Sequence, residues 1–118
     1  MKMSQQGAGY LSQQALEKVI ESVGKHKGVY GAVLSDTDGL PLQSSLPSED
    51  TEKVAAHVAS LVGKVRYISK EISNEIARSV RLELEVGDVE IIPDYDSEII
   101  IVALVKRESS TMTLSSKG

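Results

Sequence analysis

The chain of 118 residues has no cysteine, tryptophan or phenylalanine. The absence of cysteine excludes disulfides, zinc–thiolate sites, iron–sulfur clusters and thiol catalysis. Because aromatic residues make up only 3% of the chain, stacking on nucleic-acid bases is scarcely available. The net charge of −4 also fails to supply the basic face that binds phosphate backbones. We therefore expect no nucleic-acid partner.

Long apolar runs are scarce as well. The longest covers residues 99–105, far short of the roughly 20 residues that a membrane-spanning helix needs. The first ten residues lack the apolar core of a signal peptide. With 41% apolar and 25% charged residues, the composition predicts a small cytoplasmic domain with no direct membrane insertion. We expect a flexible lead over 1–9, one domain over 10–107 and a disordered, Ser- and Thr-rich tail over 108–118.

Catalytic and metal-binding motifs are missing. The sequence contains no phosphate-binding loop, nucleophile elbow or H-E-x-x-H. His26 and His57 fall on different predicted helices, and Glu83 and Glu85 are more typical of an exposed charged edge than of an acid–base pair. The Asp-Thr-Asp-Gly stretch at 36–39 opens like a calcium loop, but prolines at its sixth and twelfth positions exclude an EF-hand. We predict a protein that is not an enzyme and needs no metal or cofactor.

Hydrophobic periodicity predicts two helices and five strands. Apolar residues recur at helical spacing over 12–27 and 48–74, with Ser12 and Ser48 as expected N-caps. Strands are predicted over 29–35, 40–42, 80–86, 89–92 and 99–106. Pro41 places the second strand at an edge of the sheet. The last strand is apolar on both faces and should be central, with a helix layer on each side. The order α-β-β-α-β-β-β therefore predicts a three-layer α-β-α sandwich around an antiparallel sheet.

Two segments carry a family resemblance. The run at 28–34 leading into 38–42, and the hairpin at 88–94 followed by an Ile/Val strand, resemble the roadblock family of dynein light chains and small-GTPase-associated scaffolds. The resemblance covers about 10–107 and implies a roadblock/profilin-like fold with strand order 2-1-5-4-3. It also implies dimerisation at the edge of strand three, with the second helices paired. A polar tail in place of a third helix is similar to the dynein light chains, whereas the acidic residues of strands three and four are not.

The expected dimer interface has two parts. On helix two, small residues recur every four positions and would let two helices approach closely; the alternative is that they fit under the sheet. On strand three, an antiparallel pairing about Glu83 would set Arg81 opposite Glu85 of a second copy; the alternative is that these charges only protect the edge. The predicted interface residues are Ala55, Ala59, Val62, Gly63 and Arg66 on the helix, and Val80, Arg81, Leu82, Glu83, Leu84 and Glu85 on the strand.

A basic flank of helix two is the candidate partner-binding surface. Lys53, His57 and Lys64 share this flank, and in the family partners often dock on the paired second helices; a plain solvated face is the alternative. A second candidate is an apolar strip of the last strand at 100, 102 and 104, which we place under helix one.

The resemblance implies a non-catalytic scaffold that pairs with itself or a paralogous roadblock protein. It would bind a Ras-like small GTPase and modulate its nucleotide state or localisation, without binding nucleotide itself. The leading alternative is a dynein light chain that binds an intermediate chain segment. A novel enzyme and a ligand sensor are more distant alternatives.

Overall fold

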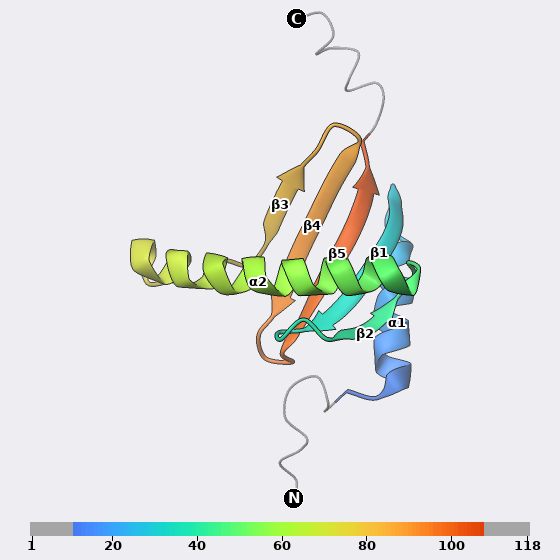
Figure 1. Ribbon diagram of the computed structural model, residues 1–118, viewed down its shortest axis with the longest axis horizontal. Helices are drawn as coiled ribbons and strands as arrows, with labels where there is room; N and C mark the ends of the chain where they lie inside the picture. The colour runs from blue at the N-terminus through green and yellow to red at the C-terminus, as the bar shows by residue number, and fades with distance from the viewer. Residues whose placement is uncertain (1–10, 108–118) are drawn as a thin grey trace, which may run out of the picture.

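The computed structural model describes residues 11–107, which form a five-stranded antiparallel sheet with one helix on each face (Figure 1). The strand order β2-β1-β5-β4-β3 and the α+β class are as predicted. The predicted lead and tail lie outside the described residues. The elements are α1 (Gln13–Gly24), β1 (Val29–Asp36), β2 (Pro41–Ser44), α2 (Ser48–Ser73), β3 (Val80–Glu83), β4 (Gly87–Asp94) and β5 (Ile99–Lys106).

Helix α1 begins where the sequence predicts and ends earlier. The Ser12 hydroxyl accepts a hydrogen bond from the Ala15 amide at 3.0 Å, as expected of an N-cap. The helix stops at Gly24 rather than near residue 27, because the chain already turns toward the sheet: the Val29 amide donates to the His26 carbonyl at 3.1 Å. The basic residues expected in the last turn therefore lie in the connection to β1.

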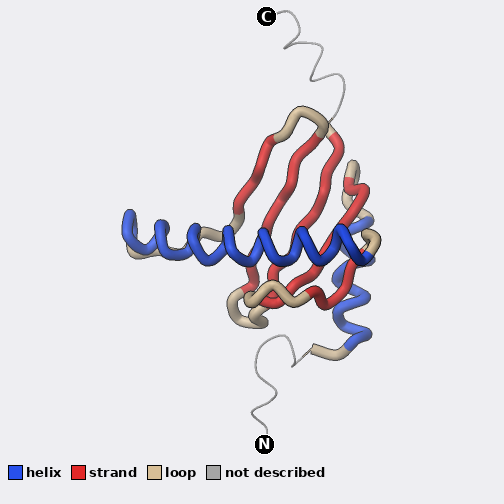
Figure 2. The backbone as a smooth tube through the Cα atoms, viewed as in Figure 1, coloured by secondary structure: helices blue, strands red, loops and turns tan. Residues whose placement is uncertain are grey.

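Helix α2 covers nearly the predicted range but has a different N-cap. Pro47 occupies the N-cap position, and Ser48 is the first helical residue, so the predicted Ser48 cap is wrong. The buried Thr51 hydroxyl lies 2.6 Å from the Ser44 hydroxyl and donates to the Leu46 carbonyl at 3.2 Å. These contacts fasten the first turn of α2 to the end of β2. The helix then crosses the face of the sheet (Figure 2).

The core lies between α2 and the sheet, with β5 at its centre. Val33 of β1, Ile91 of β4 and Ile100 and Val102 of β5 are fully buried and pack with Val58 and Val62 of α2. Ile100 and Val102 thus face α2, so the prediction that this strip lies under the first helix is wrong. The alternation of side chains turns Ile99, Ile101 and Ala103 toward the other face, where α1 packs on β1 and β2.

Candidate functional site

Strand β3 forms an open edge of the sheet. It pairs with β4 on one side and has no strand on the other within residues 11–107. It is shorter than predicted: Leu84 and Glu85 lie in the turn to β4, where the Leu84 amide donates to the Gly87 carbonyl at 2.9 Å. The predicted pairing would therefore place Arg81 opposite Glu85 of a second copy, which lies in a turn and not in a strand. Such an edge is a template for another strand unless something protects it.

The charges of β3 are already partly paired within the protomer. Arg81 Nε lies 2.9 Å from an oxygen of Glu90, its register partner on β4, while Arg81 Nη1 is 3.9 Å from Glu83. The side chains of Arg81 and Glu83 both remain more than half exposed. Exposed ion pairs of this kind contribute little to stability, about 0–1 kcal/mol. Arg81 and Glu83 are therefore available to a charged partner at the edge.

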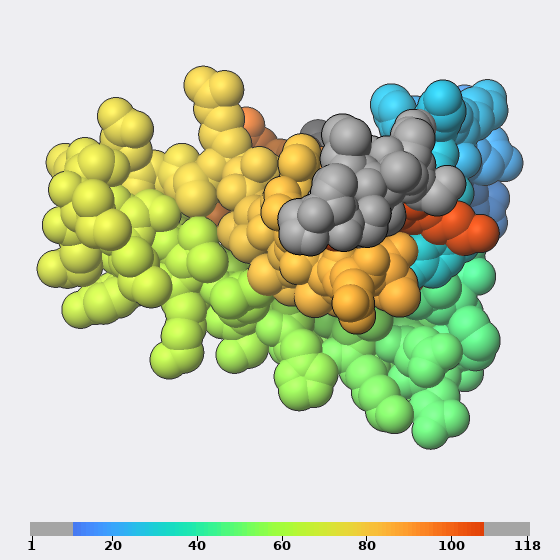
Figure 3. Space-filling model, turned by 90° about the horizontal axis from the view of Figure 1, so that it is seen from above, coloured from blue at the N-terminus to red at the C-terminus, as the bar shows by residue number. Residues whose placement is uncertain are grey.

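Helix α2 extends beyond this same edge. Its 26 residues span about 39 Å at the usual rise, whereas five strands spaced about 4.8 Å apart are roughly 19 Å wide. The C-terminal part of the helix accordingly projects past β3 and stands out from the body of the molecule (Figures 1 and 3). Here the apolar side of the helix has no sheet beneath it: Ile68 is 50% exposed and Ile72 79%.

The small residues that recur every four positions on α2, Ala55, Ala59 and Gly63, form a ridge. Over much of its length this ridge packs within the protomer. Ala55 is fully buried and Val62 nearly so, so these two predicted interface residues are already covered within the protomer and offer little surface to a partner. The β1–β2 turn packs closely against this ridge at Gly39, whose φ is +92°. A Cβ added to Gly39 would lie 3.3 Å from the Ala56 Cα and 3.5 Å from the Ala59 Cβ. Asp36 shapes this turn by accepting hydrogen bonds from the amides of residues 38 and 40.

Two of the predicted helix residues, Gly63 and Arg66, remain compatible with an interface. Gly63 is exposed, and a Cβ there would meet nothing within 4 Å. Arg66 is also exposed; its guanidinium carbon lies 4.7 Å from the ring centre of Tyr95, which ties the base of the projecting segment to the β4–β5 turn.

The predicted partner-binding residues lie together on α2. Lys53, His57 and Lys64 are all exposed, and their spacing of four and seven residues places them on one side of the helix. This flank is distinct from the apolar side that packs Val58 and Val62 on the sheet. The structure thus presents the three side chains together on an accessible surface.

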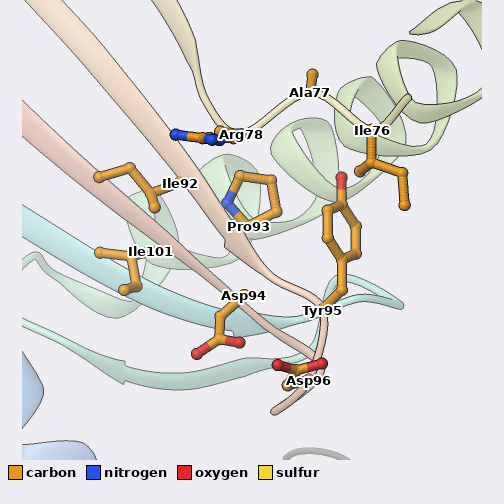
Figure 4. A pocket seen from close by; sticks show the side chains of 9 residues that line it. All are labelled: Ile76, Ala77, Arg78, Ile92, Pro93, Asp94, Tyr95, Asp96 and Ile101. Carbon is orange, nitrogen blue, oxygen red and sulfur yellow. The ribbon is translucent and has the colours of Figure 1, made fainter.

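A cavity that the sequence did not reveal lies at the other end of β3. It has a volume of about 600 Å³ and is open to solvent. Ile92 of β4 and Ile101 of β5 are register partners on the face opposite α2, and Ile92 is 41% exposed. The remaining walls come from the α2–β3 connection, the end of β4 and the β4–β5 turn (Figure 4): Ile76, Ala77, Arg78, Pro93, Asp94, Tyr95 and Asp96. Sequence periodicity could not find this site, because the connection that closes it has no regular structure.

Over residues 11–107, no group of three or more His, Cys, Asp or Glu side chains is arranged to hold a metal ion. No helix in this part of the chain is long and apolar enough to span a bilayer.

These features define a class of protein. It is an α-β-α domain in which one edge of the sheet is open and the longest helix projects past that same edge with exposed apolar side chains. A family model for the Roadblock/LC7 domain matches residues 15–104, which is most of the chain. The chain therefore belongs to the Roadblock/LC7 family, as its sequence motifs indicate.

Solved structures share the fold at low sequence identity. A Roadblock/LC7 domain from Streptomyces avermitilis is 18% identical, with a TM-score of 0.67 over 80% of this chain and 82% of its own. Myxococcus xanthus MglB is 15% identical, with a TM-score of 0.72 over 81% of this chain and 73% of its own. The gliding protein MglB from Thermus thermophilus is 14% identical, with a TM-score of 0.67 over 89% of this chain and 82% of its own.

Proposed function

We propose that the protein is a homodimeric, non-catalytic scaffold or regulator that binds a Ras-like small GTPase. The observation that supports a dimer is that two uncovered surfaces, the open β3 edge and the exposed apolar side of the projecting α2, lie on the same side of the molecule. A second copy placed at this edge extends the sheet beneath both helices and covers both surfaces at once. The resemblance to GTPase-associated roadblock scaffolds supports the class of partner.

The GTPase would dock on the paired α2 helices, through the basic flank of Lys53, His57 and Lys64. A two-fold dimer offers this flank twice. The chain supplies no phosphate-binding loop, so nucleotide would be held by the GTPase alone. The scaffold would act by binding one nucleotide state more tightly than the other, since differential affinity is what shifts an equilibrium, or by setting the GTPase's location.

The test is affinity purification from the cells that make the protein, with bound chains identified by mass spectrometry in added GTP or GDP. We expect a small GTPase whose recovery depends on the nucleotide, and its loss when Lys53→Glu and Lys64→Glu are combined. The matched control is Lys18→Glu, which replaces another exposed lysine, on α1. Recovery of no GTPase, or equal loss in the control, would contradict the proposal; recovery of a paralogous roadblock chain would replace the homodimer by a heterodimer.

The cavity beside Ile92 favours one alternative, a dynein light chain that binds an intermediate chain segment. An apolar segment could bury Ile92 and Ile101 on the half of the sheet that α1 does not cover. The two carboxylates of the lining, Asp94 and Asp96, outnumber its one cation, Arg78, and so favour basic residues in that segment. In the same purification a motor chain would appear in place of a GTPase. Its recovery would be lost with Ile92→Asp and retained with the paired lysine substitutions.

A further inference from the structure

The turn after β3 fixes which backbone groups of the strand face the open edge. The Leu84 amide donates to the Gly87 carbonyl at 2.9 Å, and the Gly87 amide donates back to the Leu84 carbonyl at 3.3 Å. In an antiparallel pair, hydrogen-bonded and non-hydrogen-bonded positions alternate. Leu82 and its register partner Val89 therefore form the next hydrogen-bonded pair, and Arg81 and Glu83 direct their amides and carbonyls away from β4.

This phase restricts how two β3 strands can pair around a two-fold axis. A residue whose amide and carbonyl face the open edge must lie opposite another such residue, because only these groups can form hydrogen bonds across the pairing. The two-fold axis therefore passes through residue 81, 82 or 83. An axis at Arg81 sets two arginines against each other, and an axis at Glu83 sets two glutamates against each other. An axis at Leu82 sets Arg81 against Glu83 of the partner subunit, twice. Opposite charges directly across an antiparallel pair stabilise it and like charges destabilise it.

We propose that two copies join their β3 strands around Leu82, so that Arg81 of each copy meets Glu83 of the partner subunit. This inference rests on the proposed homodimer and specifies its register. Arg81 uses Nε for Glu90, while its terminal nitrogen is only 3.9 Å from its own Glu83, which leaves donors for a second carboxylate. Leu82, 40% exposed on the α2 side of the sheet, meets its own copy beneath the projecting helices.

Single cysteines test the register, because the chain has no cysteine of its own. In this pairing the two copies of residue 82 form a non-hydrogen-bonded pair with Cα atoms about 4.5 Å apart, within reach of a disulfide. The two copies of residue 81, or of residue 83, lie diagonally at roughly 7–8 Å, beyond that reach. Leu82→Cys should form a cross-linked dimer on mild oxidation, whereas Arg81→Cys and Glu83→Cys alone should not. A mixture of the last two should cross-link.

A parallel measurement separates failure of the register from failure of the dimer. Sedimentation of the unsubstituted protein reports whether a dimer exists. Self-cross-linking of Arg81→Cys or Glu83→Cys in place of Leu82→Cys, in a protein that is dimeric, would overturn the register and leave the dimer intact. A monomer at all accessible concentrations would overturn both.

Charge reversal gives a readout that needs no cysteine. Arg81→Glu and Glu83→Arg should each weaken self-association by about tenfold or more, because each sets like charges against one another at both ends of the pairing. An equimolar mixture of the two variants should associate, because every opposed pair is then Glu against Arg. Unchanged self-association of Glu83→Arg would refute the register around Leu82.

Discussion

Replacing Ile72 by serine should weaken the dimer without weakening the protomer. Ile72 is 79% exposed on the projecting part of α2, so it contributes little to folding of a single chain. Complete burial of an isoleucine is worth about 1.5–3 kcal/mol. If a second copy covers half of the surface that is still exposed, each Ile72 contributes about 1 kcal/mol. Two copies contribute about 2 kcal/mol, which corresponds to a roughly 30-fold increase in the dimer dissociation constant.

Sedimentation velocity over a dilution series measures this dissociation constant, and thermal unfolding of the dilute monomer checks that the fold is intact. The matched control is Leu40→Ser, since Leu40 is 60% exposed in the β1–β2 turn, away from the β3 edge. We expect the control to leave the dissociation constant unchanged. An unchanged constant for Ile72→Ser, or an equal effect of Leu40→Ser, would refute the reasoning that the projecting helix is covered by a second copy.

Two further predictions concern glycines. Gly87→Ala should lower the free energy of unfolding by about 3 kcal/mol, because its Cβ would lie 2.3 Å from the Val105 carbonyl oxygen, a backbone atom held in the sheet. Denaturant titration measures this change. The control is Gly24→Ala, whose Cβ would meet nothing within 4 Å. Gly63→Leu should raise the free energy of unfolding by about 0.5–1 kcal/mol, because leucine favours a helix interior more than glycine and its side chain enters open space on the protomer. It should also raise the dimer dissociation constant, because the side chain would occupy the helix–helix contact of a dimer. A dimer that tolerates this leucine would remove Gly63 from the interface.

The elements with strong periodicity were predictable because burial acts on whole faces. Strand β5 carries apolar residues on both faces, and this pattern placed it correctly at the centre of the sheet. The same pattern could not say which face meets which helix, since both faces read alike; Ile100 and Val102 were therefore assigned to the wrong one. Side-chain alternation shows which residues of β5 share a face of the sheet. Only the packing of α2 in three dimensions shows which of the two faces that helix covers.

The ridge on α2 shows a second limit. Small residues permit close approach of any backbone, and the sequence does not say whose. In the fold, the turn at Gly39 packs on the N-terminal half of the ridge, where Ala55 is buried, while Gly63 remains exposed farther along the helix. The strand end was missed for a related reason: Leu84 and Val86 continue the apolar alternation of β3, although the two-residue turn to Gly87 has already begun.

The mismatch between α2 and the sheet could have been inferred from the sequence. A periodic segment of about 26 residues measures about 39 Å, and five strands cannot provide a platform wider than roughly 19 Å. A helix that lies across the strands must therefore project, and its apolar residues near position 72 must be exposed unless more sheet is supplied. Ten strands, formed by two β3 edges meeting, are roughly 43 Å wide. The length of one helix thus favours a sheet shared between two copies over a self-sufficient monomer.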